Sequence, residues 1–106
     1  MMSNALVKII INTMRKHDGL RINNFNTTIL STLADYIIIC SAVSERHAST
    51  LANKIVWQMK QCGTLCFSVE GNAKSGWILI DFLDIIVHIM LPDVRNFYNL
   101  EELWSM

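Results

Sequence analysis

The stretch that decides the fold of this chain is GWILIDFLDIIVHIMLP, which runs from Gly76 to Pro92. It contains two apolar runs, residues 77–82 and 85–91, whose β-branched and aromatic side chains are typical of strands. Because only Leu83 and Asp84 separate the two runs, we predict a hairpin. Pro92 should end the second strand, since proline has no N–H group to donate to the ladder.

Alternation along this hairpin assigns its side chains to two faces. One face is wholly apolar and should pack under helices: Ile78, Ile80, Phe82, Ile85, Val87, Ile89 and Leu91. The other is mixed: Trp77, Leu79, Asp81, Asp84, Ile86, His88 and Met90. A partly open mixed face would be a docking surface, because tryptophan is among the residues that dominate interface energies. The alternative, of equal weight, is that Trp77 packs under the C-terminal tail. Asp81 is the expected partner of His88 across the hairpin.

The remaining sequence predicts helices and strands on either side of the hairpin. Apolar residues recur at helical spacing in residues 3–18, which Ser3 or Asn4 would cap, and again from the N-cap Ser44 to Gly63. The second helix should bury Ala48, Leu51, Ala52, Ile55, Met59 and Cys62. Strands are predicted at 20–25, 36–40 and 65–69, an irregular segment at 23–31, and a short helix after Asp93.

This order of elements predicts one α/β domain over residues 1–106. Its mixed β-sheet should have about five strands flanked by helices. The strand at 36–40, the following helix and the strand at 65–69 should form a parallel, right-handed crossover.

Composition excludes several classes of function. Nine basic and nine acidic residues give zero net charge, which argues against free nucleic acid as the main partner, although a local patch is compatible with it. No apolar segment approaches the ~20 residues of a membrane span, and the N-terminus does not resemble a secretory signal. We therefore expect a cytoplasmic protein. Cys40, Cys62 and Cys66 lack zinc spacing, so we expect reduced, mostly buried thiols and no metal or cofactor.

The sequence offers little for catalysis. Cys40 and Ser41 end a buried strand, where nucleotidyltransferases place a small-residue turn. Those enzymes also need paired carboxylates to hold magnesium. Asp81 and Asp84 are separated by a turn and should not project from one strand face. We expect no enzyme. His47, near a helix start that could bind an anion, is more simply part of a solvated first turn.

Several motifs together resemble the ribosomal silencing factor family, also called RsfS or iojap-like proteins. The motifs are Ala34-Asp35-Tyr36, Ser44-x-Arg46-His47, Glu70-Gly71, residues 77–81, residues 84–88, and the long block of residues 92–104. The resemblance covers nearly the whole chain and is weakest before Leu33. The family usually has glycine where Leu83 stands, so the turn type is left open.

The resemblance implies a fold related to nucleotidyltransferases, without their catalytic carboxylates. It also implies binding to the large ribosomal subunit, on its fourteenth ribosomal protein, at the face that meets the small subunit. Such binding blocks subunit joining and represses translation, chiefly in starvation, and homodimers are known in the family. The alternatives are a nucleotide-binding or nucleotidyltransferase-like enzyme, with its site near Ser41 and Asp81, and a dimerisation module.

The partner-binding residues expected from this reading lie on the hairpin and the tail. The anchors should be Trp77, Leu79, Met90, Tyr98, Asn99 and Leu100. Lys74 and Arg95 should supply charge at the rim, which contributes more to association rate than to affinity.

Overall fold

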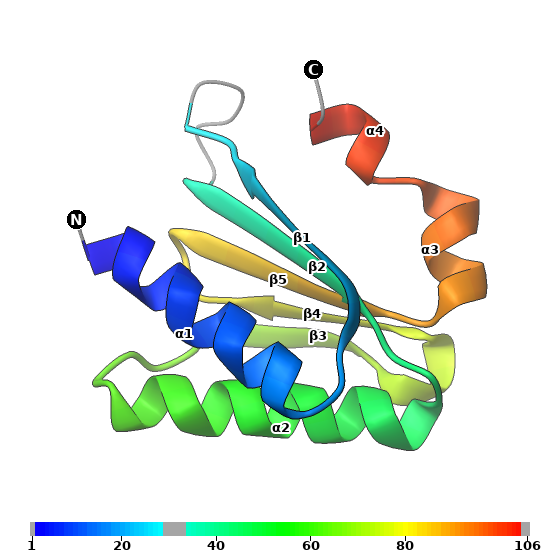
Figure 1. The fold of residues 1–106 in the computed structure, drawn as a ribbon, viewed down its shortest axis with the longest axis horizontal. Helices are drawn as coiled ribbons and strands as arrows, with labels where there is room; N and C mark the ends of the chain where they lie inside the picture. The colour runs from blue at the N-terminus through cyan, green and yellow to red at the C-terminus, as the bar shows by residue number, and fades with distance from the viewer. Residues whose placement is uncertain (1, 29–33, 105–106) are drawn as a thin grey trace.

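The structure, a computed structural model, describes residues 2–28 and 34–104. Five strands form one mixed sheet, with α1 and α2 on one face and α3 and α4 against the other (Figure 1). The elements are α1 (Met2–Lys16), β1 (Leu20–Asn26), β2 (Tyr36–Ser41), α2 (Glu45–Gln61), β3 (Ser68–Asn72), the 3-10 turn η1 (Ala73–Ser75), β4 (Trp77–Asp81), β5 (Ile85–Met90), α3 (Pro92–Tyr98) and α4 (Glu101–Trp104). The predicted mixed α/β fold is confirmed.

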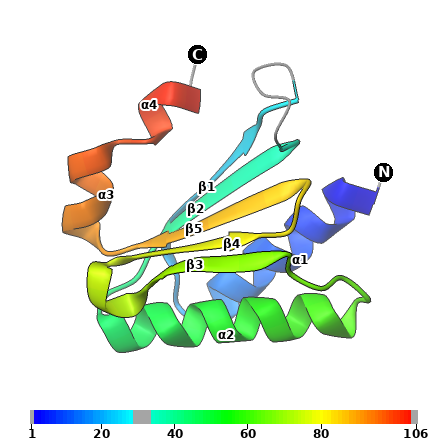
Figure 2. The ribbon, with the colours of Figure 1, turned by 180° about the vertical axis from the view of Figure 1, so that it is seen from behind.

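The strand order is β1-β2-β5-β4-β3, which Figure 2 shows from behind. The central strand β5 pairs in parallel with β2 and antiparallel with β4, so the predicted hairpin is confirmed. At the two edges, β1 pairs antiparallel with β2 and β3 antiparallel with β4. Strands β2 and β3 therefore run in the same direction, as predicted for a crossover through α2. Two strands, β5 and β4, lie between them.

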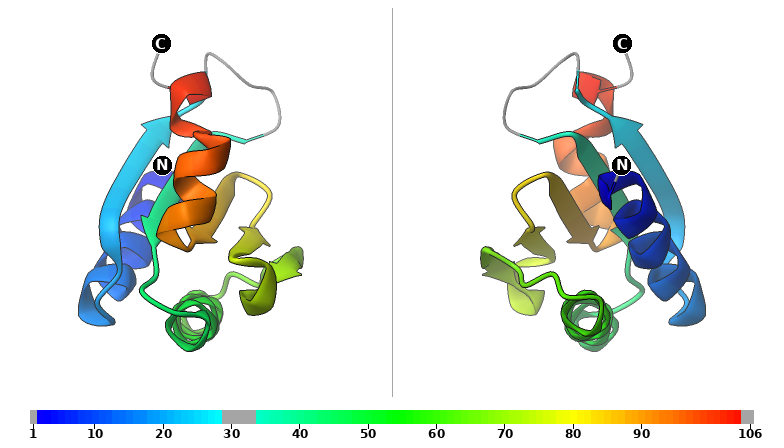
Figure 3. Two further views of the ribbon diagram at one scale, coloured as in Figure 1. Left: turned by 90° about the vertical axis from the view of Figure 1, so that its right-hand side faces the viewer. Right: turned by 90° about the vertical axis from the view of Figure 1, so that its left-hand side faces the viewer.

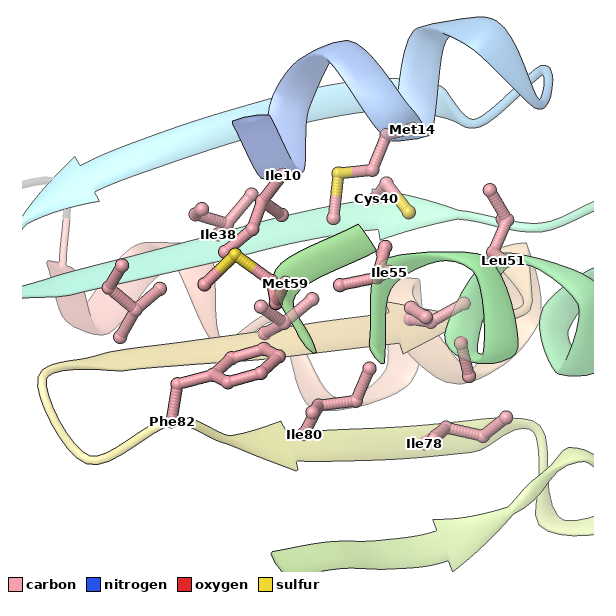
Figure 4. Packing of buried hydrophobic residues seen from close by; sticks show 14 of the residues in the cluster. Ile10, Met14, Ile38, Cys40, Leu51, Ile55, Met59, Ile78, Ile80 and Phe82 are labelled. Atoms are coloured by element: carbon pink, nitrogen blue, oxygen red, sulfur yellow. The ribbon is translucent and has the colours of Figure 1, made fainter. Parts of the chain in front are cut away.

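The main core lies between the sheet and the helices α1 and α2 (Figure 4). The wholly apolar face of the hairpin lines it, as its alternation predicts. Helix α2 contributes five of the six residues of its predicted stripe. The buried members of this core include Ile10, Met14, Ile38, Cys40, Leu51, Ile55, Met59, Ile78, Ile80, Phe82, Val87 and Ile89.

Helix α2 begins as predicted. The side chain of Ser44 accepts a hydrogen bond from the backbone N–H of His47, at 3.1 Å. At the other end, Cys62 was expected in the buried stripe but is the exposed C-cap, because the helix ends at Gln61. Cys66 is half-buried, so the prediction of mostly buried thiols holds only for Cys40. Burial raises the pKa of the Cys40 thiol to about 12.

Element boundaries differ from the predictions where pairing overrides local preference. Residues 23–25 were assigned both to the strand at 20–25 and to the irregular segment at 23–31; they belong to β1, which extends to Asn26 because its backbone pairs with β2. The predicted irregular residues 29–31 lie outside the described residues. Strand β3 starts at Ser68, three residues later than expected, and leaves Leu65 and Phe67 exposed before it. Helix α1 spans Met2–Lys16, so the predicted capping positions 3 and 4 lie inside the helix.

The hairpin turn has a defined geometry. The N–H of Asp84 donates to the carbonyl of Phe82 across the single residue Leu83, which has φ 73°; this is a γ-turn-like closure. Asp81 supports the turn, since its Oδ1 accepts from the N–H of Leu83 at 2.7 Å. The predicted pairing of Asp81 with His88 is wrong, because the strand register places Asp81 opposite Ile86.

Candidate functional site

The candidate site is built by the C-terminal tail, α3 and α4, which lies across the sheet from α2 (Figure 3). Pro92 begins α3, where its missing N–H is not needed. Asn99 ends it in the left-handed conformation, with φ 46°. This residue turns the chain so that α4 can start two residues later. Asparagine tolerates this backbone region better than most residues do.

A second, smaller apolar cluster holds the tail against the sheet. Ile37, Ile39 and Met90 are buried at its centre, and partly buried residues pack around them: Phe25, Trp77, Ile86, Val94, Leu100 and Trp104. Met90 is only 1% exposed. The prediction that Met90 is a binding anchor is therefore corrected: it supports the tail from below and offers a partner no surface.

Arg95 is the main polar link between the tail and the sheet. Its guanidinium forms a two-pronged ion pair with Glu101, Nε to Oε1 at 2.9 Å and Nη2 to Oε2 at 3.0 Å. Its Nη1 donates to Oγ of Ser41 at 3.0 Å. Because the side chain is 1% exposed, the prediction that Arg95 lies on an exposed rim is wrong. The first helical turn of α3 directs it toward the sheet instead.

Glu101 receives hydrogen bonds from two different elements. Besides Arg95, the Nδ2 of Asn23 on β1 donates to its Oε2 at 3.0 Å. The hydrogen bonds from Arg95 lower the pKa of the Glu101 carboxyl, and the one from Asn23 adds to the effect. The carboxylate is thus charged at neutral pH and joins α4 to both α3 and β1. We call this arrangement of Arg95, Glu101, Ser41 and Asn23 the tail clamp.

Aromatic rings connect the tail to the hairpin. Trp77 lies beside Tyr98, with ring centroids 4.9 Å apart, and its Nε1 donates to Nδ1 of His88 at 2.9 Å. The ring of Trp104 also packs against His88, with ring centroids 5.6 Å apart. Burial lowers the pKa of His88 to about 4, so the ring is neutral. Since Nδ1 accepts a hydrogen bond, the single proton of the neutral ring is on Nε2.

The exposed residues of the predicted site come from η1, β4 and the tail. Trp77 packs under the tail, as one alternative predicted, yet it and Leu79 stay half-exposed beside a small hollow lined also by Glu70, Gly71 and Ser75. Tyr98 is 52% and Phe97 81% exposed, in edge contact at 5.0 Å. We define the tail patch as Lys74, Trp77, Leu79, Phe97, Tyr98, Asn99 and Leu100.

Phe97 is the residue of this patch that the site prediction missed. Helical spacing contains the signal for it. Val94 packs on the sheet and Arg95 is buried, so Phe97, two positions after Arg95, projects away from the sheet. Trp104 was also missed as a site element. It lines a groove of about 420 Å³ with Leu79, Ile86 and His88 among other residues.

The segment of the chain that carries the patch is acidic. Residues 68–104 contain two basic and six acidic residues. One of the two bases, Arg95, is buried and paired, which leaves Lys74 as the exposed base of this segment. A partner with a basic surface would therefore be attracted to this face.

The other predicted sites have structural roles. The Nδ1 of His47 accepts from the N–H of Val43 at 2.9 Å, so its Nε2 carries the proton and donates to the carbonyl of His17 at 2.8 Å. His47 thereby ties α2 to the end of α1. Among the described residues, no three His, Cys, Asp or Glu side chains gather as a metal site, and no helix is long and apolar enough to cross a membrane.

Sequence comparison gives one consistent result. A family model described as "Ribosomal silencing factor during starvation" matches residues 1–106. The chain is 36% identical over 101 residues to the ribosomal silencing factor RsfS of Haemophilus influenzae, covering 95% of this chain and 99% of that protein. It is 39% identical over 73 residues to the chloroplastic protein Iojap of Zea mays, covering 66% of this chain and 30% of that longer protein.

Solved structures resemble the fold closely. A Chromobacterium violaceum protein superposes with a TM-score of 0.93 at 31% identity, over 96% of this chain and 85% of the other. A Bacillus halodurans protein superposes with a TM-score of 0.85 at 28% identity, over 95% and 94%.

Proposed function

Because this chain belongs to the ribosomal silencing factor family, we propose that it represses translation by occupying the large ribosomal subunit. In this proposal it docks on the fourteenth ribosomal protein of that subunit, at the face that meets the small subunit, and so blocks subunit joining. The name of a mouse relative, "Mitochondrial assembly of ribosomal large subunit protein 1", supports the choice of subunit. Occupying this face of the large subunit would by itself repress translation, and no chemical reaction is required.

The observation that carries this proposal is the exposed aromatic pair of the tail patch. Phe97 and Tyr98 present most of their surface to solvent, although the helix that carries them is fixed by the buried Arg95. Rigid aromatic side chains lose little conformational freedom on binding and dominate binding energy at many interfaces. The tail patch thus has the chemistry of a docking surface for another protein.

Charge favours the same class of partner. A protein embedded in ribosomal RNA carries basic residues that neutralise phosphates. The acidic surroundings of the tail patch would attract such a surface and orient it during encounter. In this proposal Lys74 faces acidic groups of the partner, which are fewer than its basic groups. Arg95 contributes to binding indirectly, because it holds α4 in place. We propose that this encounter takes place in the cytoplasm.

The same patch would also serve a homodimer. Two copies that bury Phe97 and Tyr98 against each other would hide these residues from the ribosome. Self-association and ribosome binding should therefore compete. Dilution of the protein should favour the ribosome-bound form if both use the tail patch.

Co-sedimentation with purified large subunits tests the proposal. Replacing Tyr98 with alanine should weaken binding by about 2 kcal/mol or more, about thirtyfold, if it is a central anchor. Trp77→Ala should do the same, provided that circular dichroism shows a folded protein. Phe67→Ala is the matched control, because Phe67 is 71% exposed beside the opposite end of β4.

A second readout tests the mechanism. The wild-type chain, added to separated subunits, should lower the yield of joined ribosomes, and Tyr98→Ala should restore it. Undiminished pelleting of a folded Trp77→Ala, Tyr98→Ala double variant would rule out the tail patch as the docking surface. Normal joining in the presence of saturating protein would rule out the blocking mechanism.

A further inference from the structure

The zero net charge of this chain conceals a strong separation of charge between its two faces. Helices α1 and α2 contain six basic residues and one acidic residue. Residues 68–104, in contrast, contain two basic residues and six acidic residues. Both helices lie on the same face of the sheet, across from the tail patch. The molecule therefore has a basic face that the tail patch does not use.

This basic face is grooved where the end of α1 meets the middle of α2. The groove has a volume of about 380 Å³ and is lined by Thr13, Lys16, His17, Asn53, Lys54, Trp57 and Gln58. Lys16 and Lys54 are both exposed. Within the part of the chain that the structure describes, neither forms an ion pair. Their charges are thus available to a ligand.

Trp57 is the unusual residue of this groove. It is 58% exposed on α2, one helical turn after Lys54, while the opposite side of the helix forms the core. An indole in this position adds little to packing and offers a flat aromatic surface beside two cations. Thr13 and Gln58 are less exposed and form the walls around it.

A second groove continues the basic path toward the start of α2. It has a volume of about 530 Å³, shares Lys16 and His17 with the first groove, and extends to Ser44 and Arg46. Asp18 also lines it, so two basic residues and one acidic residue supply its charge. Arg46 and Trp57 are eleven residues apart on one helix, which is about 16 Å along its axis. The two grooves together therefore form a basic track with an aromatic residue at one end.

We propose that this track binds single-stranded RNA, with a base stacked on Trp57 and phosphates at Lys16 and Lys54. Single-stranded nucleic acid is bound by positive grooves that follow the backbone and by exposed aromatic rings on which bases stack. An acidic peptide would satisfy the lysines but leave the indole without a planar partner. This activity does not depend on the proposed docking of the tail patch, which lies on the other face.

Fluorescence anisotropy of a labelled oligouridylate of about twelve nucleotides, at low salt of about 50 mM, tests this proposal. Trp57→Ala should weaken binding at least about fivefold, the lower limit for loss of one stacked base, and Trp57→Phe should restore part of it. Lys54→Gln should reduce the slope of log affinity against log salt by about 0.7, as expected for one phosphate contact to a single strand.

A matched control separates this face from the tail patch. Phe97→Ala removes one exposed aromatic ring from the other face and should leave oligonucleotide affinity unchanged. The proposal is wrong if the wild-type chain does not bind, if Trp57→Ala binds normally, or if polyglutamate displaces the oligonucleotide at equal charge. A protein that binds RNA but fails to pellet with ribosomes would contradict only the docking proposal.

Discussion

At the scale of single residues, His88 shows how burial can hold a titratable group in one state. The ring accepts a hydrogen bond from Trp77 and lies against Trp104, so a proton on Nδ1 would both break that bond and place a charge in apolar surroundings. Burial lowers the pKa of His88 to about 4 in the folded protein, from an ordinary 6.5. Between these two values the unfolded chain binds more protons than the folded one, so stability decreases as pH falls.

We predict that the free energy of unfolding decreases by about 2 to 3 kcal/mol between about pH 7.5 and pH 4.5. Urea denaturation at a series of pH values measures it. His88→Gln should flatten the dependence in this range, where Glu101 is still ionised. An unchanged slope in that variant would mean that another group causes the pH dependence.

Gly71 is a second example at the scale of single residues, because the structure shows why the Glu70-Gly71 motif needs glycine. It lies on β3 with φ 74°, and a Cβ atom there would collide with the backbone carbonyl of Trp77 on β4. Gly63 also has a positive φ, 86°, but faces open space. The two glycines therefore have the same backbone requirement but different surroundings.

We predict that Gly63→Ala lowers the free energy of unfolding by about 1 kcal/mol, the cost of the left-handed backbone alone. Gly71→Ala should cost at least about 2 kcal/mol, because β3 must also move away from β4. Thermal and urea unfolding of both variants test this. Equal losses would show that the close approach at Gly71 contributes nothing.

At the scale of elements, the tail clamp determines whether α4 stays docked. Glu101→Gln would leave the guanidinium of Arg95 buried without its counter-charge, and Arg95→Met would remove the link to Ser41 as well. Removing one partner of a buried ion pair typically costs about 3 to 5 kcal/mol. Glu101 is 19% exposed, so a loss below that range is expected here.

We predict that Glu101→Gln destabilises the protein by about 2 kcal/mol and loosens α4, so that the fluorescence of Trp104 shifts to the red. Glu70→Gln on the exposed β3 edge is the matched control and should change stability by no more than about 0.5 kcal/mol. Because the pKa of Glu101 is lowered on folding, its contribution is present above its ordinary value of 4.5 and is lost as pH falls through the folded value. A wild-type fluorescence spectrum for Glu101→Gln would contradict this role.

At the scale of the whole molecule, the two faces of the sheet differ in how firmly they are covered. The cluster under α1 and α2 contains many fully buried residues, whereas three buried residues, Ile37, Ile39 and Met90, lie at the centre of the cluster under the tail. Regions with fewer buried apolar contacts open more readily than the core. The tail should therefore detach from the sheet before the remainder unfolds.

We predict that amides of α3 and α4 exchange with solvent through an opening that costs less free energy, by about 2 kcal/mol or more, than the opening of β2 and β5. Native-state hydrogen exchange at low denaturant concentration measures both. The same free energy for the tail and for the central strands would show a single cooperative unit.

The sequence predicted more of the sheet face that packs under α1 and α2 than of the face that lies under the tail. Alternation along the hairpin correctly separated Ile78 and Ile80 from Trp77 and Leu79, because a strand must direct neighbouring side chains to opposite faces. The helix cap at Ser44 is also local and was predicted correctly. Residues 23–25 were left between strand and irregular segment, since their pairing depends on β2 and not on their own β-propensity.

The exposure of the candidate site residues was predicted in part, for a similar reason. The aromatic residues of the tail are visible in the sequence as an unusual block, and Tyr98 and Asn99 are exposed as a binding role requires. Arg95 and Met90 cannot be distinguished from surface residues by type or spacing. Whether they are buried depends on where α3 folds back, and the apolar cluster and Ser41 determine that position.

The sequence by itself determined the elements, the apolar face of the hairpin and the family, because these depend on spacing and on residue types that are close along the chain. The tertiary structure alone decided which charges are buried in the tail clamp, which aromatic rings remain exposed, and that a chain of zero net charge has one basic and one acidic face. The physical reason is that burial and electrostatic environment depend on residues that are distant in sequence, such as Ser41 and Arg95, and folding brings these together.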